Sequence, residues 1–216
     1  MLIHYQPPLS PYLDIRYQDN DILVLNKPSG LLSVPGKAPE HQDSLSLRVQ
    51  RVFPQARVVH RLDMATSGLL VMAMHLPAQR QLNQQFAARQ VQKRYVAWLD
   101  GLLTDCAGTI AVPLICDWPN RPKQKVCFIT GKQACTHFQL LEQTKDASKV
   151  WLFPITGRSH QLRVHMQWLG HPIIGDKFYA RQPVTSQQRL LLHAEYLQFH
   201  HPMTNEQVSF TLTADF

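Results

Sequence analysis

The sequence predicts an α+β fold with a mixed, largely antiparallel central sheet and a few flanking helices. Short apolar runs bounded by turn residues, which are typical of strands, recur along the chain and dominate its second half. Helical spacing of apolar residues is confined to a few segments, whereas a doubly wound sheet would alternate strands and helices regularly. Of the 216 residues 44% are hydrophobic, which is enough to build a real core.

Strands account for most of the predicted elements. Near the start, Leu13, Ile15 and Tyr17 alternate with polar residues as a half-buried strand would. After a strand over 21–25, residues 26–30 should form a loop, because proline removes a donor and glycine permits a positive φ. The other predicted strands cover 69–74, 95–99, 109–112, 125–129, 134–143, 149–155, 188–192, 196–200 and 208–212.

Helical periodicity is accompanied by end signals in a few places. Asp43 and Ser44 are candidate caps for the first helix, and Pro77 suits the first turn of the second. The third helix should begin at a Ser159 cap and stop at Gly170. The expected helices cover 45–53, 77–86 and 159–169.

No composition shift or flexible linker marks a domain boundary. We therefore expect residues 13–216 to form a single domain, preceded by an extended, proline-rich segment over 1–12. The start lacks a signal peptide and no later run approaches a membrane span, so a cytoplasmic, membrane-free protein is expected. The four cysteines form no C-x-x-C pair and are predicted to be reduced thiols.

The formal net charge of +7 favours polyanionic partners such as nucleic acid, although an ordinary basic surface is an equally simple explanation. The sequence lacks the motifs that are typical of several other functions. The 11 histidines show no H-E-x-x-H and the cysteines no paired spacing, so no metal site is expected. Phosphate-binding loops for nucleotides and the G-x-S-x-G turn of serine hydrolases are also absent.

Two segments combine basic and polar groups. Residues 59–68 place His60 and Arg61 beside one carboxylate, Asp63, ahead of a Thr-Ser-Gly turn. A lone aspartate there is more often a turn former or an ion-pair partner than a catalyst. Residues 156–166 cluster arginines and histidines at a helix N-terminus, which suits an anion as well as it suits a capped, solvated helix.

These segments resemble the signature blocks of RluA-type pseudouridine synthases. His60-Arg61-Leu62-Asp63 with Thr66-Ser67-Gly68 is similar to the stretch around that family's catalytic aspartate. Further matching blocks occur in the family's order. They cover 26–31, 93–97, 157–163, 171–176 with Tyr179, and 190–194.

The resemblance implies a catalytic set and a cofactor-free reaction. Asp63 would be the nucleophile, and Arg163 would pair with it and keep it ionised. Tyr95 would stack on the uracil and could move a proton, although a strand tyrosine in the core is the simpler explanation without the resemblance. An intact set argues against the alternative, an inactive RNA-binding or ribosome-assembly protein with the same fold.

The resemblance also implies RNA contacts. The target uridine must leave the stack, and Arg61 could fill the space it vacates. Trp118 could stack on an unpaired base or lie in the core. His60 and His160 are further candidates for RNA contacts. Candidates for phosphate contacts, each with a solvated-surface alternative, are Lys93, Arg94, Arg121, Lys123, Lys125 and Arg158.

Within the family, the stretch 113–126 is most similar to a compact branch that modifies both transfer RNA and 23S ribosomal RNA. The expected partners are therefore stem-loops of both RNAs, including the tRNA anticodon stem-loop. No separate N-terminal RNA-binding domain, no nucleotide cofactor and a monomeric protein are expected. A metal-dependent nuclease is a weaker alternative, because the sequence offers no carboxylate cluster.

Overall fold

The computed structural model describes residues 5–181 and 189–216, which fold into two compact units. We call them the Asp63 unit, residues 5–93 with 193–215, and the Arg163 unit, which holds the other described residues. Both contain sheet and helix, and nearly all strand pairs are antiparallel. The predicted α+β class is confirmed.

The Asp63 unit is built on a sheet in the order β1-β2-β4-β11, with β3 added beside β4 and β12 beside β11. Only the β4–β11 pair is parallel among these. β2 and β4 are buried on both faces, so their sequences are continuous apolar runs rather than alternating ones. The strands are β1 (Ile15–Gln18), β2 (Ile22–Lys27), β3 (Arg57–Val58), β4 (Ser67–Ala73), β11 (Leu192–His200) and β12 (Gln207–Thr211).

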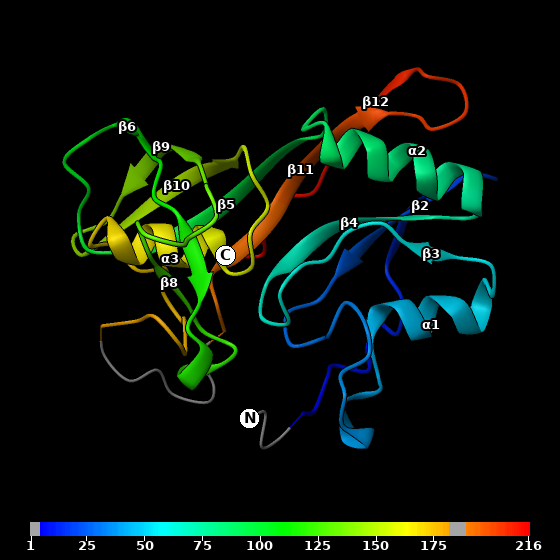
Figure 1. Ribbon diagram of the computed structural model, residues 1–216, viewed down its shortest axis with the longest axis horizontal. Coiled ribbons are helices and arrows are strands. Elements are labelled where there is room, and N and C mark those ends of the chain that lie inside the picture. Colours follow the sequence, from blue (N-terminus) through cyan, green and yellow to red (C-terminus); the bar gives the residue numbers. More distant parts are fainter. Residues whose placement is uncertain (1–4, 182–188) are drawn as a thin grey trace. The chain divides into compact units, whose positions relative to one another are not determined.

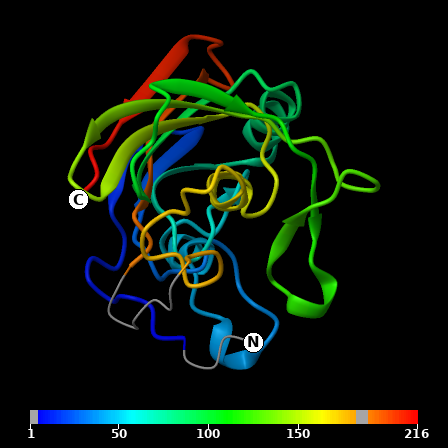
Figure 2. The same cartoon turned by 90° about the vertical axis from the view of Figure 1, so that its left-hand side faces the viewer.

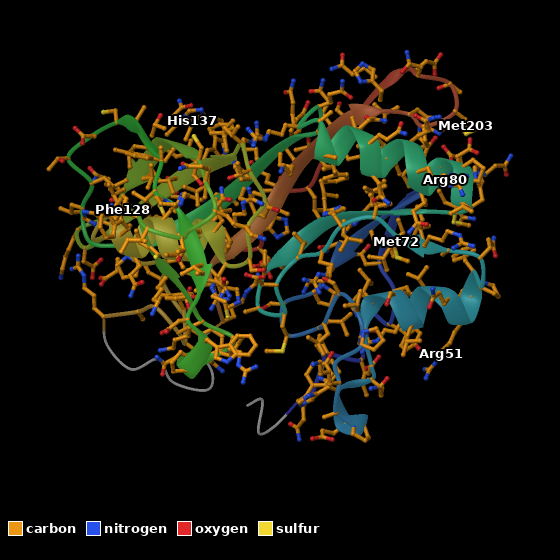
Figure 3. All side chains as sticks on the ribbon, viewed as in Figure 1. Arg51, Met72, Arg80, Phe128, His137 and Met203 are labelled. Carbon is orange, nitrogen blue, oxygen red and sulfur yellow. The ribbon has the colours of Figure 1, made fainter. Side chains whose placement is uncertain are left out.

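Helices α1 (Leu45–Val52) and α2 (Leu76–Ala87) lie on opposite sides of β2 and β4 (Figure 1). Ser44 caps α1, because its hydroxyl accepts from the Leu47 amide, as predicted. α2 is capped by a histidine instead, since His75 Nδ1 accepts from the Ala78 amide at 3.2 Å. Met72 is buried in this unit, whereas Arg80 of α2 is exposed (Figure 3).

The Arg163 unit contains an antiparallel sheet in the order β5-β10-β9-β6 and a separate hairpin, β7–β8. Figure 2 shows this hairpin as a two-stranded arm in green, with a short 3₁₀ helix (Trp118–Asn120) between its strands. α3 (Gln161–Trp168) supplies Val164 to a small core with Leu114 and Tyr179. The strands are β5 (Gln92–Asp100), β6 (Ala107–Ile110), β7 (Leu114–Cys116), β8 (Gln124–Val126), β9 (Thr136–Gln143) and β10 (Ala147–Pro154).

Several predicted boundaries were wrong. β1 is exposed rather than half-buried, with Ile15 and Tyr17 39% and 40% exposed. The N-cap of α3 is His160, not Ser159, and it has a left-handed φ of 53°. Of the strand expected over 188–192, only Leu192 lies in β11; Gln188 falls outside the described residues.

The described part of the N-terminal segment, residues 5–12, contains no helix or strand. It is tied to the Asp63 unit by its tyrosines. The Tyr5 hydroxyl donates to Asp43 O at 2.7 Å and accepts from the Leu32 amide at 2.9 Å. The Tyr12 ring lies 4.9 Å from the Arg48 guanidinium, so the segment packs against α1.

Candidate active site

The loop that carries Asp63 is held by the segment that follows β2. The Gly30 amide donates to Met64 O at 2.8 Å, and the Ser29 hydroxyl donates to Ala65 O at 2.7 Å. Ser33 forms a reciprocal pair with Leu62, donating to its carbonyl at 2.7 Å and accepting from its amide at 3.1 Å. The backbone on both sides of Asp63 is therefore fixed by hydrogen bonds.

Lys27, at the end of β2, is fully buried beneath this loop. Its ammonium donates to the carbonyls of Pro28 at 2.8 Å, Leu31 at 2.7 Å and Met64 at 3.1 Å. Carbonyl oxygens supply the negative ends of dipoles, and three of them offset part of the cost of burying the charge. Lys27 thus joins the segment after β2 to the Asp63 loop.

The Thr-Ser-Gly turn after Asp63 is shaped by a close backbone contact. Gly68 has a φ of 112°, and a Cβ there would lie 2.4 Å from Ala194 O of β11. Ser67 Oγ lies 2.9 Å from His193 Nδ1, which fixes the same two strands to each other. Only glycine allows β4 to start this close to β11.

His60 supports the loop from inside the unit. Its Nε2 accepts from the Val71 amide at 3.1 Å, and its ring stacks on Phe86 at a centroid distance of 4.7 Å. Burial, with the neighbouring charge of Lys93 as a second cause, lowers the pKa of His60 to about 3. The imidazole is a neutral acceptor, a structural role that the sequence did not indicate.

The side chains of the loop differ in exposure. Asp63 is half-buried, whereas Arg61 is exposed, as a residue that enters an RNA stack would need to be. The Thr66 amide donates to Asp63 O at 3.1 Å and closes the turn. The predicted contact between Arg163 and Asp63 stays a prediction.

In the Arg163 unit, Arg163 forms a bidentate pair with Asp176. Nε and Nη2 of the guanidinium lie 2.7 Å from the two carboxylate oxygens, and the side chains are only 4% and 0% exposed. Asp176 also accepts from the amides of Phe178 and Tyr179 at 2.9 and 3.2 Å. Both rings lie about 5 Å from the guanidinium carbon, at 5.2 and 5.1 Å.

The Tyr179 hydroxyl connects α3 to the hairpin. It accepts from the Gln124 amide of β8 at 2.8 Å and lies 2.7 Å from His160 Nδ1. His160 is half-buried and stacks on Phe178 at 5.8 Å. His160 therefore contacts the two aromatic residues that pack against Arg163. It also lies at the helix N-terminus, where an anion contact was predicted.

Four of the predicted RNA-binding residues of this unit lie on the hairpin: Trp118, Arg121, Lys123 and Lys125. Trp118 is 67% exposed, so a core position for it is wrong. The Arg121 guanidinium carbon lies 3.9 Å from the centroid of the Trp118 ring. Lys125 is exposed and lies 3.2 Å from Asp117, while Lys123 is half-buried. Because the Lys125 side chain is 56% exposed, its ion pair with Asp117 stabilises the fold little.

The remaining predicted residues lie on β5 and before α3. Tyr95 is half-buried rather than part of the core. The Arg94 guanidinium carbon lies 4.5 Å from the Trp151 ring centroid, and burial lowers the pKa of Lys93. Arg158 is exposed, with Nε donating to Gln133 O at 3.1 Å. Arg158 is thus the most accessible cation of this group.

Asp19, Asp21 and His201 converge closely enough to suggest a metal site, but their hydrogen bonds indicate another role. His201 Nδ1 accepts from the Thr204 amide at 3.2 Å, so its proton lies on Nε2, which donates to Asp19 at 3.1 Å. A metal on Nε2 would require the proton on Nδ1, where the backbone amide already points. The cluster joins the β1–β2 and β11–β12 turns.

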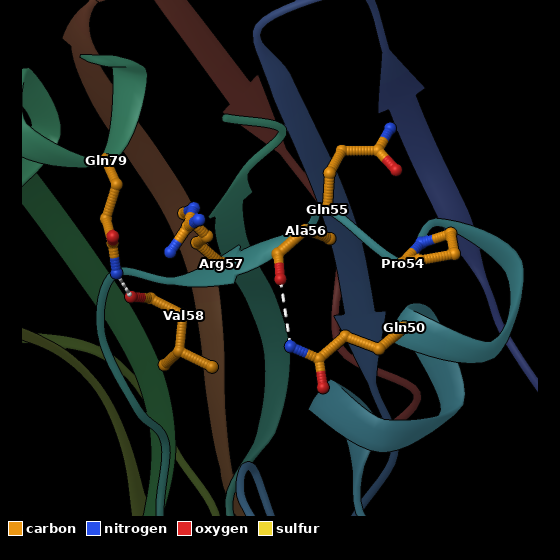
Figure 4. Close-up of a pocket in the computed structure, with 7 residues that line it drawn as sticks. All are labelled: Gln50, Pro54, Gln55, Ala56, Arg57, Val58 and Gln79. Atoms are coloured by element: carbon orange, nitrogen blue, oxygen red, sulfur yellow. Dashed lines mark hydrogen bonds between the residues drawn. The ribbon is translucent and has the colours of Figure 1, made fainter. Parts of the chain in front are cut away.

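A surface pocket of about 300 Å³ lies between α1, β3 and α2 (Figure 4). Two of its three glutamines bind the backbone: Gln50 donates to Ala56 O at 2.9 Å and Gln79 to Val58 O at 2.8 Å. None of the predicted catalytic or RNA-binding residues lines it. We therefore assign the pocket no part in the chemistry.

A family model described as RNA pseudouridylate synthase matches residues 21–168, which include Asp63, Tyr95 and Arg163. The chain belongs to this family. Its relatives include the dual-specificity RNA pseudouridine synthase RluA of Escherichia coli strain K12, 54% identical over 99% of this chain and 98% of that protein. The enzyme of the same description from Haemophilus influenzae is 51% identical over 100% and 99%.

Solved structures of the family have the same fold. The human RNA pseudouridylate synthase domain containing 1 protein aligns with a TM-score of 0.79 and 31% identity, over 98% of this chain and 87% of that one. The human domain containing 4 protein aligns with a TM-score of 0.74 and 25% identity, over 93% and 88%. The inactive RNA-binding alternative is not favoured, since relatives along the whole chain are named as RNA pseudouridine synthases.

Sequence reasoning missed the supporting residues of this synthase fold. Asp176 and Lys27 lie inside blocks that matched the family, but no role could be read from them. Charged residues inside matched blocks were the available signal, and only the coordinates show that these side chains are buried and which groups they contact. No helix in residues 5–181 or 189–216 is long and apolar enough to cross a membrane.

Proposed function

We propose that this protein isomerises specific uridines to pseudouridine in stem-loops of transfer RNA, including the anticodon stem-loop, and of 23S ribosomal RNA. The observation that carries the proposal is 54% identity along 99% of the chain to a synthase named for dual specificity. The basic hairpin and the net charge of +7 support an RNA partner. We further propose that it works as a cytoplasmic monomer with one catalytic domain.

Asp63 is proposed as the nucleophile. The bond from ribose C1′ to N1 of the base breaks, the base turns, and a bond from C1′ to C5 forms. C5 loses a proton and N1 gains one, so no cofactor or metal is needed to balance the reaction. A carboxylate can attack C1′ or C6, or stabilise charge at C1′ during elimination to a glycal, and all three routes are open to Asp63.

The structure of the Asp63 loop supports this assignment. Catalysis needs a carboxylate held within a fraction of an ångström, and the hydrogen bonds to Leu62, Met64 and Ala65 hold the backbone on both sides of Asp63. Arg61 is proposed to fill the stack once the base has turned out, and Tyr95 to lie against the uracil. Arg163 is proposed as the counter-ion of Asp63.

Release of tritium from C5-labelled uridine tests the proposal directly. We expect release from transcripts of both transfer RNA and 23S stem-loops, undiminished by excess chelator and without cleavage of the RNA chain. Mapping of pseudouridine should then place the product in stem-loops. Chain cleavage that the chelator stops would instead indicate a metal-dependent nuclease, and binding without release would indicate an inactive RNA-binding protein.

A further inference from the structure

Asp176 is one of the most buried acidic side chains of the Arg163 unit, with 1% of its surface exposed. Four donors converge on it: Arg163 Nε and Nη2, and the amides of Phe178 and Tyr179. Both amides bind the same oxygen, Oδ1, so the carboxylate is itself fixed by the backbone. A group this constrained can orient whatever it binds.

The pair with Asp176 occupies the Nε–Nη2 edge of the guanidinium. Because a guanidinium is planar and rigid, binding one edge at two points fixes the plane and the direction of the Nη1 corner. The rings of Phe178 and Tyr179, at 5.2 and 5.1 Å from the guanidinium carbon, limit the remaining tilt. Arg163 therefore has little freedom to reorient.

Stability alone is a poor explanation for this arrangement. Burying an arginine and an aspartate together costs desolvation energy that their attraction often only offsets, and apolar residues of similar size would stabilise as well. What the pair does provide is a fixed orientation of the Arg163 guanidinium, and the proposed reaction would depend on that orientation.

We propose that Asp176 is a positioning residue, which sets the orientation of Arg163 toward the nucleophile. The inference rests on the proposed function, in which Arg163 serves Asp63. Asp176 acts on turnover only through Arg163 and does not touch the RNA.

Single-turnover pseudouridine formation by Asp176→Asn tests the proposal. We expect the rate of the bound complex to fall by about 100-fold, the usual effect of displacing a catalytic group by about 1 Å, with apparent RNA affinity changed less than about threefold. If Asp176→Asn does not fold, Asp176→Glu replaces it, since it keeps the charge balance but moves the guanidinium; at least a tenfold loss is then expected.

Asp43 provides a matched control for general destabilisation. It forms a bidentate pair of the same geometry with Arg48, at 2.8 and 2.6 Å; Arg48 is fully buried, and the Asp43 side chain is 34% exposed. Asp43→Asn should lower the melting temperature but keep the parent single-turnover rate at a temperature where both variants are folded. A rate loss in Asp43→Asn equal to that of the Asp176 variant would overturn the proposal.

A double-mutant cycle decides whether Asp176 acts through Arg163. We expect Arg163→Met to reduce the rate by at least 100-fold, and Asp176→Asn to cause no further loss in that background. Parent turnover in the Asp176 variants, or losses that multiply, would overturn the inference. If the parent protein forms no pseudouridine, the proposed function is contradicted instead. The positioning can then still be tested by NMR: the Nε proton of Arg163 should be protected from exchange in the parent protein and lose that protection in Asp176→Asn.

Discussion

His60 was predicted to contact RNA, and the structure shows that it also has a structural role. Its ring is a neutral acceptor for the Val71 amide, and burial lowers its pKa to about 3 from an ordinary 6.5. Below pH 6.5 the unfolded chain takes up a proton on this histidine, and the folded protein does not until the pH approaches 3. The free energy of unfolding should therefore fall as the pH falls through this window.

His60→Gln tests this behaviour, because glutamine keeps an acceptor oxygen but does not titrate. In the parent protein His60 should account for a loss of up to about 2 kcal/mol of unfolding free energy between pH 7 and pH 5. Urea unfolding at the two pH values should show that loss reduced in His60→Gln. An unchanged difference in His60→Gln would contradict the assignment.

For single residues, the sequence indicated which residues belong to the candidate site better than it indicated which groups they contact. Asp63 was found because its neighbours form a motif, and motifs are local. Asp176, which pairs with Arg163, is 13 residues away from it, a spacing that no helix or strand period connects. The burial of Lys27 was equally invisible, because its acceptors are backbone carbonyls, which every residue has.

The hairpin β7–β8 is the element whose function can be tested most directly. Trp118, Arg121 and Lys123 lie in the connection between its strands and Lys125 lies on β8. The bond from the Gln124 amide to the Tyr179 hydroxyl holds the first residue of β8. An anchored arm with cationic side chains at and beside its tip suits an RNA backbone, since phosphate contacts position a partner without reading its sequence.

Replacing Arg121, Lys123 and Lys125 with glutamine should weaken RNA binding and flatten its salt dependence. Each lost phosphate contact should reduce the slope of log affinity against log salt by up to about one unit. Filter binding across a salt series should show this for transfer RNA and ribosomal stem-loops together, because phosphates carry no base identity. Turnover of bound substrate should change far less.

The control is a triple variant with the same charge change elsewhere. Arg16, Arg80 and Lys145 are exposed and lie on β1, on α2 and before β10, and replacing them with glutamine should keep most of the slope. Equal slopes in the two triple variants would make the hairpin an ordinary solvated surface. Loss of only one RNA class would indicate that the hairpin reads bases.

Elements with local end signals were predicted well, and short or exposed ones were not. α1 has a Ser44 cap and a clear apolar face, and its predicted and observed ends nearly coincide. β3 and β7 were missed because two and three residues are too few to show a period. The Ser159 cap was wrong because the helix begins at Gln161, so that His160, in a left-handed conformation, occupies the N-cap position.

For the molecule as a whole, binding and catalysis should depend on different residues. The net charge of +7 attracts RNA over a broad surface, and removing one carboxylate changes that field little. The sequence could predict this charge and the α+β class because both are sums over many residues. It could not predict the two compact units, since no linker or composition shift separates residues 93 and 94, where one unit gives way to the other.

Asp63→Asn should separate the two properties. The change keeps the shape of the side chain and removes the nucleophile, so isomerisation should be abolished while RNA affinity stays within about tenfold of the parent value. Tritium release and filter binding on the same preparations give both quantities. Asp105→Asn, an exposed aspartate replaced in the same way, should keep parent turnover. Turnover near the parent rate in Asp63→Asn would remove Asp63 from the chemistry, whereas a collapse of binding would mean that one carboxylate, rather than the basic surface, holds the RNA.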